Sequence, residues 1–208
     1  MGSLEASWEY AERFVPEDPV LITARRRADE VGCTPVGPGA GAALRLIASL
    51  VGAKSVIELG TGTGVSGVWL LRGMRADGVL TSVDSEAEHQ RLARTTFDEA
   101  GFAGGRVRLI NGAALEVLPR FTDGAYDLVL ADAARAEYAG YLEEARRLLR
   151  PGGVVVFNGA LGHRVADESV SDAGATALRT LGAGVLDDEG FVPALLAAGE
   201  GLLVAVKR

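Results

Sequence analysis

A glycine-rich turn at the end of a strand-like run constrains the fold of this chain more than any other feature. The apolar run Ser55-Val56-Ile57 leads into Glu58-Leu59-Gly60-Thr61-Gly62-Thr63-Gly64, and the segment from Val65 to Arg72 can form a helix. Because glycine lacks a Cβ atom, such a turn lets the backbone approach a ligand closely between a strand and a helix. The pattern therefore predicts a nucleotide-like cofactor site.

A second acidic residue supports this interpretation. Asp84 ends the strand-like run from Val79 to Val83. It lies about 20 residues beyond the glycines, where Rossmann-type folds place the carboxylate that binds a ribose. The glycines run G-x-G-x-G with Glu58 upstream, whereas dinucleotide sites usually read G-x-G-x-x-G. The departure favours S-adenosylmethionine over NAD.

The rest of the chain alternates between strand-like and helix-compatible segments, which predicts parallel strands with helices on both faces of one sheet. We expect Pro151-Gly152-Gly153 to stop a helix that contains Tyr141 to Leu149 and to launch the next strand. The strand-like runs centre near Val56, Leu80, Val107, Leu128 and Val155.

Each end of the chain carries a pattern of its own. Trp8 belongs to a stripe of apolar residues at helical spacing and is expected to pack, and Asp18-Pro19 predicts the start of a second helix. Near the other end, two strand-like runs flank Gly199-Glu200-Gly201, which predicts a hairpin. We predict one domain over residues 1–208, with a helical extension at 1–35 and a cofactor-binding core at 36–208.

Composition excludes several classes of function. The net charge is −7, and basic runs such as Arg25-Arg26-Arg27 are best interpreted as solvated helix faces, so we expect no nucleic-acid partner. Cys33 is the single cysteine, which excludes an internal disulfide and suits a reducing compartment. Neither a signal peptide nor an uncharged apolar run of about 20 residues is apparent. We expect a cytoplasmic protein without a membrane partner.

In its glycine turn and in the position of Asp84, the chain resembles the class I S-adenosylmethionine-dependent methyltransferases. More narrowly, it resembles the O-methyltransferases related to catechol and caffeoyl-CoA O-methyltransferases, over nearly its whole length. The resemblance implies an α/β, Rossmann-like fold with a mostly parallel seven-stranded sheet, a terminal antiparallel hairpin and helices on both faces. It also implies S-adenosylmethionine as cofactor, a small hydroxylated acceptor, aromatic or not, and a homodimer.

The resemblance also assigns parts of the cofactor to particular residues. The glycine turn would lie near the amino-acid part with Glu58 fixing it, Ser66 would bond the cofactor carboxylate, and Asp84 would accept from the ribose hydroxyls. Helix capping is the alternative for Ser66 and Thr61, and a solvated turn acid is the alternative for Asp84. The backbone of Ala113 would lie near the adenine. The implied cofactor-binding residues are Val36, Glu58, Gly60, Thr61, Gly62, Ser66, Asp84, Ser85, Ala113 and Asp132.

The active centre departs from the family pattern. Relatives bind a divalent cation through an aspartate after the fourth strand and an aspartate-asparagine pair after the fifth. Asp132 matches the first ligand, but Asn158 and Gly159 stand at the other two positions. Mg²⁺ favours carboxylate oxygens, so we predict no tight metal site. Arg135 stands where catechol-type enzymes carry a lysine proposed as general base. Arginine stays protonated, so it can clamp a carboxylate or phenolate but cannot take a proton.

Three residues are therefore candidates for catalysis. Asp132 would orient or deprotonate the acceptor hydroxyl, Arg135 would bind an anionic oxygen, and His163 is a secondary candidate in the loop after the fifth strand, where solvent exposure is the alternative. His89 is expected at the surface. Direct displacement by the acceptor oxygen then needs mainly alignment and exclusion of water.

Two other functions remain open from the sequence. One is an NAD-linked oxidoreductase on a Rossmann fold, against which the glycine spacing argues. The other is a cofactor-binding protein without catalysis, which the altered residues Arg135, Asn158 and Gly159 permit.

Overall fold

Seven strands form one mixed sheet in the computed structural model, which describes residues 3–102, 104–162, 164–167 and 169–208. The strand order is β3-β2-β1-β4-β5-β7-β6, with β1 to β5 parallel and β7 antiparallel to both of its neighbours. This confirms the predicted sheet and its terminal hairpin. The strands are β1 (Ser55–Leu59), β2 (Val79–Asp84), β3 (Val107–Asn111), β4 (Tyr126–Ala131), β5 (Leu149–Asn158), β6 (Phe191–Leu196) and β7 (Leu202–Lys207).

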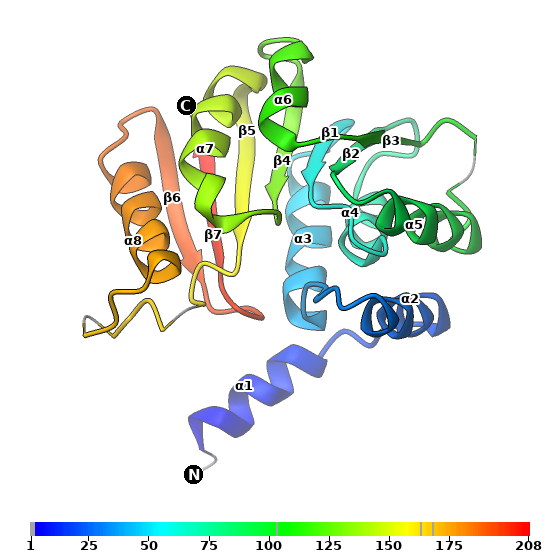
Figure 1. The fold of residues 1–208 in the computed structure, drawn as a ribbon, viewed down its shortest axis with the longest axis horizontal. Coiled ribbons are helices and arrows are strands. Elements are labelled where there is room, and N and C mark those ends of the chain that lie inside the picture. Colours follow the sequence, from blue (N-terminus) through cyan, green and yellow to red (C-terminus); the bar gives the residue numbers. More distant parts are fainter. Residues whose placement is uncertain (1–2, 103, 163, 168) are drawn as a thin grey trace.

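Helices connect the strands and pack around the sheet, and Figure 1 shows α1 at the edge of the molecule, away from the strands. The α-helices are α1 (Leu4–Arg13), α2 (Pro19–Glu30), α3 (Pro38–Leu50), α4 (Val65–Gly73), α5 (Ala87–Glu99), α6 (Ala114–Val117), α7 (Tyr138–Leu148) and α8 (Ala173–Leu186). Two short 3₁₀ helices complete the set, η1 (Leu118–Arg120) and η2 (Arg135–Glu137). No helix in the described part of the chain is long and apolar enough to span a membrane.

The two faces of the sheet carry separate apolar cores because successive strand residues point to opposite sides. Ile57 and Leu59 of β1 belong to the core that includes α7 and α8. Val56 belongs to the core on the other side, with residues of α2, α3, α4 and α5. Glu58 shares the side of Val56, so the alternation buries a carboxyl group beneath α4.

The junction between α7 and β5 differs from the prediction. The helix ends at Leu148 and the strand begins at Leu149, both before Pro151-Gly152-Gly153. The pairing of β5 with β4 then changes register between Tyr126 and Leu128, and Gly152 has a φ of +76°. Proline and glycine therefore shape an irregularity inside the strand, a place where both are tolerated, and do not end the helix.

The arginine run on α2 also differs from the prediction of a solvated face. Arg25 donates hydrogen bonds to the carboxylate of Glu17 and to the carbonyl of Val36. Arg27 forms an ion pair of 2.6 Å with Glu99 of α5. Because all three partners lie outside the helix, the two arginines fix α2 to the segments before and after it and to α5.

Candidate functional site

The glycine turn after β1 lies directly against the end of β4. Gly60 has a φ of +95°, a region that side chains with a Cβ atom rarely occupy. A Cβ atom built on Gly60 would lie 2.3 Å from the carbonyl oxygen of Asp132. The Asp132 amide in turn donates to the Leu59 carbonyl over 2.8 Å. Glycine is thus required here for a close approach that joins two strand ends.

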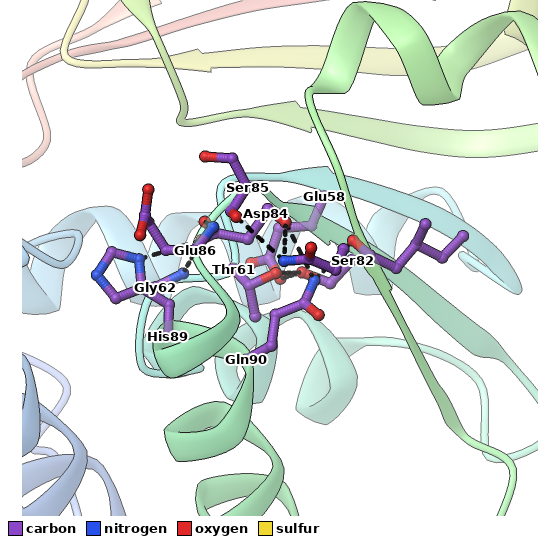
Figure 2. Close-up of polar contacts among 11 residues, drawn as sticks. Glu58, Thr61, Gly62, Ser82, Asp84, Ser85, Glu86, His89 and Gln90 are labelled. Carbon is purple, nitrogen blue, oxygen red and sulfur yellow. Dashed lines mark hydrogen bonds and ion pairs between the residues drawn. The ribbon is translucent and has the colours of Figure 1, made fainter.

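Glu58 supports this turn, and Figure 2 shows it among the polar side chains next to Thr61 and Ser82. Its carboxylate is fully buried and accepts hydrogen bonds of 2.6 Å from the Ser66 and Ser82 hydroxyls. Ser82 also lies 2.7 Å from the Thr61 hydroxyl. Burial raises the pKa of Glu58 to about 7. Glu58 therefore holds α4, β2 and the turn together from a position behind the cavity.

Asp84, at the end of β2, faces the turn. Its Oδ2 accepts from the Gly62 amide over 3.0 Å, and its Oδ1 accepts from the Glu86 amide over 2.9 Å. His89 of α5 places Nδ1 3.4 Å from Oδ2 of the same carboxylate (Figure 2). The His89 side chain is 22% exposed and lines the cavity, so it is only partly the surface residue that the sequence predicts.

A cavity of about 260 Å³ opens above the turn, and a smaller one of about 130 Å³ continues past Asp84. Both include Gly60, Asp84, Ser85 and Ala133, so they form one elongated groove along the strand ends. The larger part also includes the predicted residues Thr61, Gly62, Ser66 and Asp132, and the smaller part includes Ala113. Cys33, Thr34 and Pro35, which sequence reasoning did not single out, form another side of the groove.

This groove has the features that a nucleoside cofactor with an amino-acid tail requires. It offers a close backbone approach at the glycines, a carboxylate at Asp84 for hydroxyl groups and a small cavity beside Ala113 for a flat ring. The hydroxyl of Ser66 already donates to Glu58, so this side chain can meet a cofactor carboxylate only by giving up that bond.

A second cavity of about 670 Å³ lies next to the groove and shares Asp132 with it. Its walls come from α1, from the segment before α3, from the ends of β4 and β5 and from the β6–β7 turn. Trp8 lies there with 45% of its surface exposed, so its side chain is only partly packed and borders the cavity. The lining residues are Trp8, Glu12, Arg13, Thr34, Pro35, Val36, Gly37, Pro38, Asp132, Arg135, Asn158, Gly199 and Glu200.

Asp132 lies between the two cavities with its carboxyl group oriented by Asn158. The Asn158 amide donates to Asp132 Oδ1 over 2.8 Å. Part of the Asp132 surface is accessible, but its carboxyl group is buried. This burial raises the pKa of Asp132 to about 7, although the Asn158 hydrogen bond and the Arg135 charge both act to lower it. A carboxyl group placed here can contact ligands on both sides.

Arg135 lines the cavity of about 670 Å³ beside Asp132, while His163 falls outside the described residues. The Arg135 guanidinium donates to Glu200 over 2.6 Å. It also covers Gly159, where a Cβ atom would lie 2.4 Å from Nη2. Val36, predicted to line the cofactor pocket, lines the larger cavity instead.

These residues do not fit the divalent cation that the family pattern implies. Among the described residues, no group of three His, Cys, Asp or Glu side chains could hold a metal ion. Asn158 donates its side-chain NH2 group to Asp132 and offers a cation only a neutral amide oxygen, and Gly159 has no side-chain atom that could bind one. A guanidinium covers Gly159, and its positive charge repels a cation.

Comparisons with known proteins agree with this geometry. The sequence matches the O-methyltransferase family over residues 11–208. It is 48% identical, over 99% of both chains, to a protein of Mycolicibacterium smegmatis that is named as an O-methyltransferase. The crystal structure of a Corynebacterium glutamicum protein is 30% identical, with a TM-score of 0.90 over 99% of this chain and 97% of that chain.

A third match was crystallised with S-adenosylmethionine. It is the O-methyltransferase TomG from Streptomyces achromogenes, which is involved in tomaymycin synthesis; it is 27% identical, with a TM-score of 0.86 over 99% of both chains. Because the similarities extend over nearly the whole chain and not over one motif, the chain belongs to the O-methyltransferase family.

Proposed function

We propose that this protein transfers a methyl group from S-adenosylmethionine to a hydroxyl group of a small acceptor, without a divalent cation. The observation that carries the proposal is the position of Asp132, which lines both the groove above the glycine turn and the large neighbouring cavity. A residue in that position can contact the cofactor and the acceptor at the point where they meet. The family membership and the S-adenosylmethionine complex of TomG support this proposal.

The groove residues would hold the cofactor, which supplies a methyl group on a positively charged sulfur. The glycine turn would approach the amino-acid part. Asp84 would accept from the ribose hydroxyls, and the backbone of Ala113 would border the adenine. Asp84 is already oriented by the amides of Gly62 and Glu86, so little side-chain freedom is lost on binding.

On the acceptor side, Asp132 would accept a hydrogen bond from the hydroxyl group and take its proton as the oxygen bonds to the methyl carbon. The bond between that carbon and the sulfonium sulfur would break in the same step, and its electron pair would leave with S-adenosylhomocysteine. Asn158 would keep the carboxyl group in place for this transfer. Correct alignment of the oxygen with the methyl group is then the largest contribution of the protein.

The first test is calorimetric titration with S-adenosylhomocysteine in buffer that contains a chelator. We expect micromolar binding, weakened at least tenfold in Asp84→Asn, because a charged acceptor for two hydroxyl groups becomes neutral. Asp98→Asn, at an exposed position on α5, is the matched control and should bind like the wild type. Labelled S-adenosylmethionine with a panel of hydroxylated arenes then tests turnover. Absence of cofactor binding under any condition would contradict the proposal.

We also propose that two copies of the chain associate. Tyr10 and Phe14 on α1 and at its end are 71% and 69% exposed, which supports an interface at this helix. Sedimentation velocity of the full chain measures the assembly directly, and a monomer at all concentrations would contradict it. The cytoplasmic location stays a prediction.

A further inference from the structure

The guanidinium of Arg135 is held in one place within the acceptor cavity. Arg135 lies on η2, three residues after Asp132, and its side chain is 31% exposed. Nη2 donates to Glu200 on the β6–β7 turn, and the guanidinium lies against Gly159 at the end of β5. These contacts come from two different segments, so they fix the guanidinium from two sides.

The guanidinium occupies space that is open because positions 159 and 162 are glycines, which have no side chain. A Cβ atom on Gly159 would lie 2.4 Å from Nη2, and one on Gly162 would lie 3.4 Å from Nη1. Any side chain at position 159 would therefore push the guanidinium out of its place.

The charge of Arg135 is balanced mainly by a group that can be replaced. Glu200 is 59% exposed at the mouth of the cavity, so much of its interaction with Arg135 is screened by water. Asp132, the other nearby carboxyl group, is engaged by the Asn158 amide. An arginine offers five N–H donors in a planar fork that matches a carboxylate. An incoming carboxylate can thus take over the bond that Glu200 makes now.

We propose that the acceptor carries a carboxylate beside the hydroxyl group that is methylated, and that Arg135 binds this carboxylate in exchange for Glu200. Asp132 and Arg135 both line the cavity from one short segment, which requires the hydroxyl and the carboxylate to be neighbours on the acceptor. Trp8 lines the same cavity and suits an acceptor with a flat ring. This inference rests on the proposed function, since it names the class of acceptor for the same site.

The test compares pairs of acceptors that differ in charge alone. We would titrate 2-hydroxybenzoate, 2-hydroxybenzamide and the matching pair on a naphthalene ring into the protein saturated with S-adenosylhomocysteine, with chelator present. The carboxylates should bind at least about tenfold more tightly than the carboxamides. Arg135→Gln should abolish this preference while S-adenosylhomocysteine still binds. Glu200→Gln should strengthen carboxylate binding severalfold, because the competing carboxylate is removed. Arg26→Gln, at an exposed position on α2 outside the lining of this cavity, should leave the preference within about twofold.

Several results would overturn the inference. These are equal binding of carboxylate and carboxamide, failure of every carboxylate to bind, a preference that survives in Arg135→Gln, or carboxylate binding that requires added Mg²⁺. In each case normal binding of S-adenosylhomocysteine and turnover with a neutral phenol would leave the proposed function standing. Loss of cofactor binding by the unmodified protein would instead refute the proposed function itself.

Discussion

The contact between the glycine turn and the end of β4 makes Gly60→Ala the most informative substitution. A Cβ atom at this position would lie 2.3 Å from the Asp132 carbonyl oxygen and 2.8 Å from its carbonyl carbon. A carbon–oxygen contact needs about 3.3 Å, so the two strand ends must separate by roughly 1 Å. Both are backbone segments at the centre of the sheet, so no flexible side chain can move aside to make room.

The cost of this substitution has two parts. A φ of +95° strains alanine by about 1–2 kcal/mol, and the forced separation adds about 1–3 kcal/mol. The expected loss is therefore about 2–5 kcal/mol of the free energy of unfolding. Gly52→Ala separates the two effects, because Gly52 has a φ of +59° and a Cβ atom there would meet no other atom within 4 Å. We expect Gly52→Ala to lose only about 1 kcal/mol.

Cofactor binding provides the second measurement for this pair. A displacement of about 1 Å at the turn should weaken binding of S-adenosylhomocysteine by about 100-fold in Gly60→Ala, whereas Gly52→Ala should bind normally. Urea unfolding and calorimetry measure the two quantities. The reasoning is refuted if Gly60→Ala has the same unfolding midpoint as Gly52→Ala and binds the ligand within twofold of the wild type.

Three further predictions follow from single contacts. Burial raises the pKa of Glu58 from 4.5 to about 7, so the folded protein binds one more proton than the unfolded chain between these pH values, and stability falls as the pH rises through that window. The loss from this group is up to about 3 kcal/mol, and urea unfolding at pH 5 and pH 8 should show that Glu58→Gln lacks it. An equal loss in both proteins would count against this reasoning. Glu12 on α1 accepts hydrogen bonds from the amides of Gly39 and Gly199, so Glu12→Ala should release α1 and speed tryptic cleavage of this helix about tenfold. The control Glu9→Ala removes only an exposed ion pair and should not change the rate. Equal cleavage rates in the two variants would refute the role of Glu12 in holding α1. Asp132→Asn should lower turnover about 10²- to 10⁴-fold while S-adenosylhomocysteine binds within a few-fold, and near-normal turnover would exclude Asp132 as the base.

Local patterns predicted the part of the site that follows from strand ends. In a parallel sheet, the carboxyl ends of neighbouring strands meet at one edge, so Gly60, Asp84 and Asp132 had to lie close together once the strands were identified. The order of β1, β2 and β4 in the structure places them there. The same reasoning succeeded for the terminal hairpin, because a glycine-containing turn between two apolar runs is also a local signal.

Local sequence patterns did not predict the surroundings of side chains that lie next to a distant part of the chain. His89 lies among charged residues of α5, which indicates a surface position, yet the first turn of this helix brings it to 3.4 Å from Asp84. Trp8 fits the apolar spacing of a packed helix, yet α1 lies beside a cavity and leaves the indole 45% exposed. In both cases the spacing within the helix was interpreted correctly, but the neighbours across the fold were unknown.

The acceptor side is the extreme case, because its polar contacts join residues that are far apart in the sequence. Glu12 reaches the Gly199 amide, 187 residues away, and Arg135 reaches Glu200, 65 residues away. Both contacts end on the same β6–β7 turn, so this turn connects α1 with the guanidinium of Arg135, and both line the same cavity. An acceptor that replaces Glu200 at Arg135 would also disturb the turn that anchors α1. We therefore expect acceptor binding to be coupled to the position of α1 through four residues that no sequence motif brings together, Glu12, Gly199, Glu200 and Arg135.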